Sequence, residues 1–595
     1  TLNFGVPFAR FGTAYFPFST LGENFEKWHM PGQSKESYWP LSADTVTQWK
    51  LFADDIRRDL RIAKSMGFES IRLHHLELID PLPKEVQHEY LDFFFGELKQ
   101  LGLTALIDCE LPAARVAELV KRYRPQIDGV EIDNEVLIFG IDDEDLERWK
   151  ETYQAVKAIA PDLPVWLTGH TNTGAFDRLR KLDVPFDMVG AHAYMDSLDA
   201  IPSARGYGLA VANYATEIGK PPIITEWNWR FLTRMTPEAR AEVYPPIFEN
   251  VLKTRCMPMV YQFQFQESLA MASKTLRGIR HYEQLNLSRR PRAEAFEMMT
   301  LIDRYGDPNG PIRRLSTIGV EDHFVATFKD GVAHGKFYLA NESADHKSLA
   351  LSAALEGPPG VQLSLDDPAD AKIALAGGET RSVRFTAKLG NDAAPGFYHV
   401  FLRLEGENNF LRYAWAEARN PGAPKIDKAK DKGSHAEVAY GEGALDYDFN
   451  RDLAIVYADG RDAESRWDVE SAWLLYQTLE SATGRAVRIF QLKDLPAELR
   501  KSGNLIVVGM PASHELIGAV QAEIKPQGKS WIARARAGEK RGDWLIVAGD
   551  DEASLNLSAI DLALRYWKHA KDSGCRRVPL TDMPINRGAD PSLLP

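Results

Sequence analysis

The sequence predicts a multidomain α/β protein with a (β/α)8 TIM barrel, an immunoglobulin-like β-sandwich and a small α/β domain, in this order. Residues 1–310 alternate short apolar runs with amphipathic stretches, residues 311–420 lose the helical periodicity, and residues 437–595 alternate again. A chain of 595 residues is also too long for one hydrophobic core. Residues 421–436 are rich in Pro, Gly and Lys, which indicates an exposed linker.

The first domain contains eight strand candidates, each followed by a helix candidate. The strands are 11–16, 70–75, 105–110, 129–135, 165–170, 188–194, 222–227 and 259–265. The helices are 46–66, 84–100, 113–124, 144–159, 174–182, 205–218, 237–254 and 292–305. Eight strand–helix pairs of this length are typical of a (β/α)8 barrel, in which chemistry takes place at the carboxyl ends of the strands.

The second and third domains differ in their hydrophobic period. Residues 311–420 contain short alternating runs separated by turn residues, namely 323–328, 335–341, 348–355, 382–389, 396–404 and 410–418. This pattern indicates a β-sandwich of immunoglobulin type. The third domain alternates strand-like runs with helix-like stretches, which indicates an α/β fold. The strand-like runs are 453–458, 486–492, 504–509 and 544–550, and the helix-like stretches are 464–482 and 552–568.

Composition excludes several kinds of partner. The net charge of −13 argues against nucleic acid or an anionic membrane, because phosphate binding needs a basic surface. No apolar run approaches the roughly 20 residues of a membrane span. The cysteines Cys109, Cys256 and Cys575 have the spacing of neither a zinc site nor a disulfide framework, so they do not fix the compartment.

Two glutamates end separate strands of the predicted barrel. Glu135 follows Asn134 at the end of VEIDNE (130–135), and Glu226 ends PPIITE (221–226). Both runs are rich in apolar residues, as expected of buried parallel strands. Two carboxylates brought together from separate strand ends are what a two-carboxylate glycosidase requires.

Alternation of side chains along a strand predicts which residues share a face. It groups Glu131 with Asp133 and Glu135, Arg72 with His74, Gly190 with His192 and Tyr194, and Glu226 with Ile224. Buried carboxylates need a partner, and Arg72 is the predicted one. The other predicted cleft residues are His74, His192 and Gln262 as lining, Tyr194 and Asn134 as hydrogen-bonding groups, and Trp39, Trp227 and Trp229 as stacking platforms.

The Asn-Glu pair ending strand four and the Glu ending strand seven resemble clan A of the glycoside hydrolases, over about half of the chain. The resemblance implies a retaining mechanism with Glu135 as acid/base and Glu226 as nucleophile. It also implies that Asn134 binds the sugar 2-hydroxyl and that Arg72, His192 and Tyr194 support the site. Many members of the clan carry Trp near the end of strand eight, where this chain has VYQFQFQ (260–266), so Phe263, Phe265 or another aromatic residue would replace it.

The sequence therefore predicts a retaining glycoside hydrolase that cleaves β-glycosidic bonds of a polysaccharide or oligosaccharide, such as a β-glucan or galactan, without metal or organic cofactor. A non-catalytic carbohydrate-binding barrel and a metal-dependent barrel hydrolase are the alternatives. The second needs a His-x-His after strand one, which Ala14-Tyr15-Phe16 does not provide. A secreted or periplasmic location follows from the expected substrate, with a cytoplasmic one left open, as are endo or exo action and oligomeric state.

Overall fold

The structure is a computed structural model. It describes residues 8–15, 49–73, 76–79, 83–135, 137, 143–169, 173–195, 210–229, 245–246, 248–249, 251–253, 255–263, 265, 285, 293–307, 315–316, 325–341, 347–358, 360–390, 393, 396–407, 410–420, 438–449, 451–458, 468, 471–472, 475–476, 479, 487–525, 528–538, 541–551, 554–555, 557–559 and 561–563. Within these ranges the strands form four sheets, and none of the helices has both the length and the apolar character that a membrane crossing requires.

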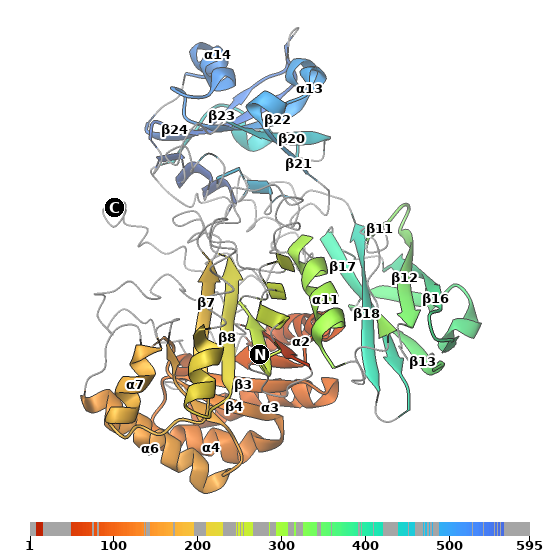
Figure 1. The fold of residues 1–595 in the computed structure, drawn as a ribbon. Helices are drawn as coiled ribbons and strands as arrows, with labels where there is room; N and C mark the ends of the chain where they lie inside the picture. Colours follow the sequence, from red (N-terminus) through yellow and green to blue (C-terminus); the bar gives the residue numbers. More distant parts are fainter. Residues whose placement is uncertain are drawn as a thin grey trace.

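The first sheet is a parallel barrel with strand order β5-β4-β3-β2-β1-β9-β8-β7-β6. Its strands are β1 (Arg10–Tyr15), β2 (Ser70–Leu73), β3 (Thr104–Cys109), β4 (Ile127–Ile132), β5 (Val165–Trp166), β6 (Thr168–Gly169), β7 (Val189–Met195), β8 (Pro222–Trp229) and β9 (Met259–Gln262). β5 and β6 are two halves of one predicted strand. β5 pairs with β4 and β6 with β7, so this segment closes the barrel. All eight predicted strands are confirmed. Figure 1 labels β3, β4, β7 and β8 of this barrel.

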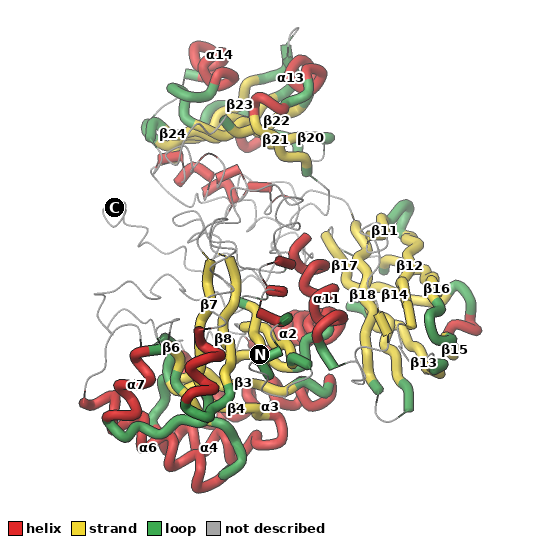
Figure 2. Tube along the Cα trace, in the orientation of Figure 1, coloured by secondary structure: helices red, strands yellow, loops and turns green. Residues whose placement is uncertain are grey.

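Helices surround the barrel, as Figure 2 shows. They include α2 (Trp49–Met66), α3 (Lys84–Leu101), α4 (Ala113–Tyr123), α6 (Asp143–Ile159), α7 (Gly174–Lys181) and α11 (Ala293–Tyr305). Their apolar faces share one core cluster with the outward side chains of the strands. The helices also contact each other: Phe95 of α3 stacks on Tyr123 of α4 with ring centroids 4.2 Å apart. Gly102 ends α3 in the left-handed conformation (φ 59°) that glycine adopts readily. The predicted helices 205–218 and 237–254 lie partly outside the described residues.

The barrel interior is built in layers. A lower layer is apolar and consists of Leu106, Trp166, Met188, Ile223 and Tyr261. Glycines make room for the large rings of this layer: a Cβ at Gly129 would lie 2.5 Å from the Trp166 ring. Because inward side chains recur every second residue, the next inward positions lie one layer nearer the carboxyl ends of the strands. That next layer is charged, and it holds the candidate site.

The second and third sheets face each other and share a core. Their orders are β10-β12-β16-β14 and β11-β18-β17-β13-β15. The strands are β10 (Leu315–Ser316), β11 (Val325–Thr327), β12 (Val332–Asn341), β13 (Leu349–Glu356), β14 (Val361–Leu365), β15 (Lys372–Leu375), β16 (Thr380–Leu389), β17 (Gly396–Glu405) and β18 (Leu411–Asn420). Phe385 from one sheet and Leu402 from the other belong to the same buried cluster. The sequence missed β10, β14 and β15, and immunoglobulin-type connectivity stays a prediction.

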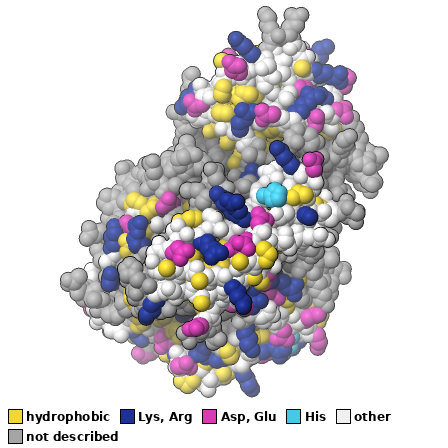
Figure 3. Space-filling view, turned by 90° about the vertical axis from the view of Figure 1, so that its right-hand side faces the viewer, with side chains coloured by type: hydrophobic (Ala, Val, Ile, Leu, Met, Phe, Trp, Pro, Cys, Tyr) yellow, Lys and Arg dark blue, Asp and Glu magenta, His cyan; other side chains and the backbone are white. Residues whose placement is uncertain are grey.

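The double sheet packs on the barrel through β17 and β18, which lie beside α2 and α11 in Figure 1. Phe401, Tyr413 and Trp415 are buried in the barrel's own core cluster. An ion pair between Arg61 and Glu356, at 3.1 Å, also crosses this contact. Figure 3 faces the double-sheet side of the molecule, where described acidic and basic side chains are interspersed.

The fourth sheet has the order β19-β23-β24-β22-β20-β21 and is parallel except for the antiparallel pair β23–β24. The strands are β19 (Val438–Tyr440), β20 (Leu453–Tyr457), β21 (Arg488–Gln491), β22 (Asn504–Gly509), β23 (Ser530–Ala535) and β24 (Trp544–Gly549). Apolar clusters cover both faces, with α13 (Ala497–Ser502) and α14 (Glu515–Ile524) among the connections. The sequence identified β20, β21, β22 and β24 but missed β19, β23, α13 and α14.

Candidate active site

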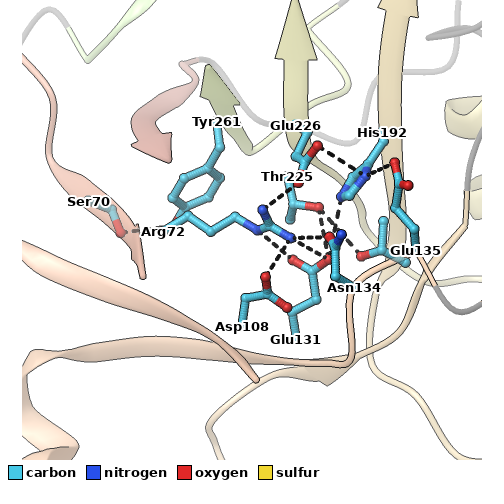
Figure 4. Close-up of polar contacts among 11 residues, drawn as sticks. Ser70, Arg72, Asp108, Glu131, Asn134, Glu135, His192, Thr225, Glu226 and Tyr261 are labelled. Carbon is cyan, nitrogen blue, oxygen red and sulfur yellow. Dashed lines mark hydrogen bonds and ion pairs between the residues drawn. The ribbon is translucent and has the colours of Figure 1, made fainter. Parts of the chain in front are cut away.

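Arg72 is the centre of the charged layer and is fully buried (Figure 4). It stands on β2, two residues after Ser70. Its Nη1 donates to Glu226 Oε1 at 2.6 Å, its Nε to Glu131 Oε2 at 3.0 Å, and its Nη2 to Asn134 Oδ1 at 2.9 Å. Asp108 Oδ2 lies 3.1 Å from the same Nη2. The predicted pairing of a buried arginine with the carboxylates is confirmed.

The end of β4 departs from the predicted alternation. Asp133 and Glu135 have φ angles of 60° and 55°, so the chain leaves the extended conformation after Ile132. Asp133 therefore turns out of the barrel toward α6, while Asn134 turns inward to Arg72. The prediction that Glu131, Asp133 and Glu135 share one face is wrong, because alternation holds only while the backbone stays extended.

A β-bulge changes the facing of residues at the end of β8. Ala191 of β7 pairs with Ile224, but the next residue, His192, pairs with Glu226, so β8 has one extra residue at Thr225. Ile224 packs in the outer core, whereas Thr225 and Glu226 both contact interior groups. The predicted common face of Glu226 and Ile224 is therefore wrong, and the bulge is what turns Glu226 toward Arg72.

His192 lies between the two glutamates and is fully buried. Its Nδ1 is 2.8 Å from Glu135 Oε1 and 3.4 Å from Glu226 Oε2, and its Nε2 is 3.5 Å from Glu131 Oε1. One ligand-type atom of each of Glu135, His192 and Glu226 lies within 4.8 Å of the other two. The two glutamates that the sequence singled out thus meet at one point of the barrel. The Glu135 side chain is 18% exposed and that of Glu226 only 4%, so Glu135 is the one that solvent reaches more readily.

Electrostatics fixes the charge of the supporting groups. Burial by itself would lower the pKa of His192, but Glu226, Glu131 and Glu135 outweigh it and raise the pKa to about 10. Burial would likewise raise the pKa of Glu131, but Arg72 and His192 outweigh it and lower the pKa to about 2. At neutral pH His192 is therefore an imidazolium and Glu131 a carboxylate. The pKa of Arg72 is raised: burial opposes this, but Asp108, Glu131 and Glu226 prevail.

Two further predicted site residues take other places. Trp227 is 1% exposed and packs in the outer core against Phe248, with ring centroids 4.3 Å apart, so it is no stacking platform. Gln262 shares a face of β9 with Val260 of the outer core, opposite Tyr261, and accepts a hydrogen bond from Thr13 Oγ1 at 3.0 Å. Tyr261 points into the barrel, so the adjacent Gln262 points away from it and does not line the cleft.

Phe265 is fully buried in the outer core as well, which excludes it as a sugar platform. His74 and Trp39 lie outside the described residues. Tyr194 and Trp229 stand on β7 and β8, but their side chains lie outside the described part of the structure. Their predicted roles stay predictions.

Sequence reasoning missed Asp108 and Thr225 as neighbours of the site. Asp108 follows Leu106 by two residues on β3, so continued alternation from that apolar position would have found it. Thr225 likewise follows Ile223 of that layer by two residues on β8, and the bulge is what adds Glu226 to the same face.

Comparison with known proteins gives no relative by sequence: no family model and no curated protein matches. Solved structures match at low similarity. An FMN-binding beta-glucuronidase from Facaelibacterium prausnitzii L2-6 is 12% identical with a TM-score of 0.36, and the match covers 70% of this chain and 57% of that one. For GH5_18 from Streptomyces cattleya in complex with GlcNAc the identity is 14% and the TM-score 0.38, with 54% and 84% covered.

A family 39 glycoside hydrolase from Bacteroides cellulosilyticus WH2 is 12% identical with a TM-score of 0.35, and the match covers 65% of this chain and 82% of that one. These likenesses are too distant to carry a functional argument. The closed parallel barrel is nevertheless the fold that the resemblance to clan A implied.

Proposed function

We propose that this protein is a retaining glycoside hydrolase that cleaves β-glycosidic bonds of a polysaccharide or oligosaccharide. The observation that carries the proposal is the approach of Glu135 and Glu226 to within 4.8 Å at the carboxyl end of the barrel. Retaining enzymes hold their two carboxyl groups about 5–5.5 Å apart, whereas inverting enzymes need about 6.5–9.5 Å to admit a water molecule. The short approach favours retention.

The reaction takes two steps. In the first, Glu135 donates a proton to the glycosidic oxygen while a Glu226 oxygen attacks the anomeric carbon, which breaks the glycosidic bond and forms a glycosyl ester. In the second, Glu135 takes a proton from water, the water oxygen attacks the anomeric carbon, and the Glu226 carboxylate leaves. Arg72 orients the Glu226 oxygen at 2.6 Å and stabilises it as a carboxylate.

Asn134 has a defined orientation in this mechanism. Because its Oδ1 accepts from Arg72 at 2.9 Å, its amide nitrogen points away from the guanidinium. We assign this nitrogen as the donor to the sugar 2-hydroxyl, a contact that strengthens in the transition state. No cofactor enters either step.

The test is a Glu226→Ala variant assayed on aryl β-glycosides. We expect turnover to vanish, and added azide to restore a single displacement that yields a glycosyl azide of inverted configuration, identified by NMR. The matched variant Glu135→Ala should give an azide product of retained configuration, because the nucleophile is intact. Substantial activity of Glu226→Ala without azide would overturn the assignment.

A metal-dependent hydrolase is the second candidate, because Glu135, His192 and Glu226 are close enough to share a divalent cation. Metal ligation requires an imidazole nitrogen turned toward the ion, whereas His192 Nδ1 lies at hydrogen-bond distance, 2.8 Å, from Glu135 Oε1. Metal analysis of the purified protein and assays with a chelator distinguish the candidates. A panel of β-glucans, galactans and aryl glycosides tests the non-catalytic binding alternative at the same time.

We propose the domain division 1–310, 311–420 and 437–595, with a linker at 421–436. The β-sandwich and the terminal α/β domain would then act as spacers or interface modules of the catalytic barrel. A secreted or periplasmic location would agree with a polysaccharide substrate.

A further inference from the structure

The chain segment that delivers Glu135 has an unusual backbone. Among the described residues, six non-glycine residues have positive φ angles, and two of these, Asp133 and Glu135, lie within three residues of each other. Such a conformation costs about 1–3 kcal/mol per residue and persists only where surrounding contacts impose it. The contacts that impose it here are therefore of functional interest.

Asp133 is held from outside the barrel by helix α6. Its side chain is fully buried. Arg148 Nη1 donates to Asp133 Oδ1 at 2.6 Å, and Arg148 Nη2 makes a second, parallel contact with Oδ2. Trp149 Nε1 donates to the same Oδ2 at 2.7 Å. Three donors on one carboxylate, two from a guanidinium, form a strong and directional anchor.

The anchor determines where the next two side chains point. With Asp133 turned outward, Asn134 reaches Arg72 at 2.9 Å inside the barrel and Glu135 reaches His192 at 2.8 Å. If residue 133 relaxed to an extended backbone, alternation would turn Asp133 inward and Asn134 outward. Glu135 would still face inward, but an extended backbone over residues 133–135 would carry it farther along the strand, away from Glu226.

We propose that Asp133, clamped by Arg148 and Trp149 of α6, is a positioning residue that aims Glu135 at the glycosidic oxygen. The inference rests on the proposed function, because it assumes that Glu135 is the proton donor. Asp133 touches neither the substrate nor the nucleophile in this account. It acts through the backbone of the two residues that follow it.

The experiment compares two substrates that differ in their need for a proton. Departure of phenol from a phenyl β-glycoside depends on protonation, whereas 2,4-dinitrophenol leaves without it. We expect Asp133→Asn, which is nearly isosteric and tolerates positive φ, to lower kcat/KM on the phenyl glycoside about 10- to 100-fold, because small misplacement of a catalytic group costs up to about 100-fold. On the dinitrophenyl glycoside the loss of kcat/KM should stay below about threefold, because general acid catalysis is not needed there.

Two further variants make the result interpretable. Trp149→Phe removes one hydrogen bond to Asp133 and keeps the ring, so we expect the same imbalance between substrates at a smaller size; it also carries the test if Asp133→Asn does not fold. Asp128→Asn is the matched control. Asp128 lies on the same strand and forms an ion pair with Arg10 at 3.2 Å, but at the opposite end of the barrel. Its removal should change thermal stability without changing the ratio of the two activities.

The outcomes separate the inference from the proposed function. If neither the wild type nor Glu135→Ala cleaved either substrate, the inference and the proposed function would both be overturned. A different result would overturn only the positioning role. In that case the wild type is active and Glu135→Ala shows the imbalance, but Asp133→Asn and Trp149→Phe lose kcat/KM equally on both substrates or lose none. The expected pattern, imbalance in all three variants and none in Asp128→Asn, supports it.

Discussion

Replacement of Arg72 by methionine tests the charge network under the proposed site. The variant keeps an unbranched apolar stem but leaves Glu131, Glu226 and Asp108 without their guanidinium. The pKa of Glu131 is lowered from 4.5 to about 2 by Arg72 and His192 against the effect of burial. Since one pKa unit corresponds to about 1.4 kcal/mol, ionised Glu131 contributes on the order of 3 kcal/mol to stability.

A second estimate agrees with this magnitude. Removing one partner of a buried ion pair costs about 3–5 kcal/mol, because the other charge stays buried without compensation. Arg72 is fully buried and contacts three carboxylates, so we expect the barrel to lose at least about 3 kcal/mol at neutral pH. As a control, Arg122→Met breaks an exposed pair with Asp92 and should cost about 1 kcal/mol or less.

The pH dependence has a defined sign. The folded-state pKa of Glu131 lies below its ordinary value, so the stabilisation is fully present above pH 4.5 and is lost as the pH falls toward 2.

The assay is hydrogen exchange of the amides of β2 and β4 in wild type and variant, which reports the free energy of local opening in a multidomain chain. Equal protection of wild type and Arg72→Met at pH 7, within about 1 kcal/mol, would show that Arg72 does not stabilise the buried carboxylates.

Two further predictions follow from the same structure. The pKa of His192 is raised to about 10, so its contribution to barrel stability is fully present below pH 6.5 and is lost as the pH rises through 10. The melting temperature of His192→Gln should lack this alkaline loss. A pH profile of the melting temperature that equals that of the wild type would contradict the assignment. Gly129→Ala would place a methyl group 2.5 Å from the Trp166 ring and should cost about 1–3 kcal/mol by overpacking. Gly96→Ala, in α3 with open space around it, should instead stabilise the protein by up to about 1 kcal/mol. Equal melting temperatures of the two glycine variants would show that the barrel interior has room for a methyl group at residue 129.

Local patterns in the sequence predicted the strands, the two glutamates and the buried arginine. A run such as SIRLHH (70–75) becomes a buried strand because its own side chains are apolar on one face, and the polar residue on its other face must then find a partner. That reasoning led to Arg72 without knowledge of any neighbour. Strands β14 and β15 escaped detection because they are short and their alternate side chains are exposed, which leaves a weak signal.

The wrong predictions at the ends of β4 and β8 share one cause, because the side-chain directions there depend on contacts between distant segments. The outward turn of Asp133 depends on Arg148 and Trp149, and the bulge at Thr225 is visible only in the pairing of β7 with β8. Trp227 was expected in the cleft and lies in the core for the same reason, since the bulge reverses which residues of β8 face inward.

Hydrophobic period depends on neighbouring residues, so the sequence alone could predict a parallel barrel that brings two acidic strand ends to one rim. The three-dimensional contacts decide which oxygen of each glutamate faces His192, namely Oε1 of Glu135 and Oε2 of Glu226. Side-chain direction at a strand end depends on a few backbone angles. Those angles are set by hydrogen bonds and ion pairs to residues that the sequence does not place nearby.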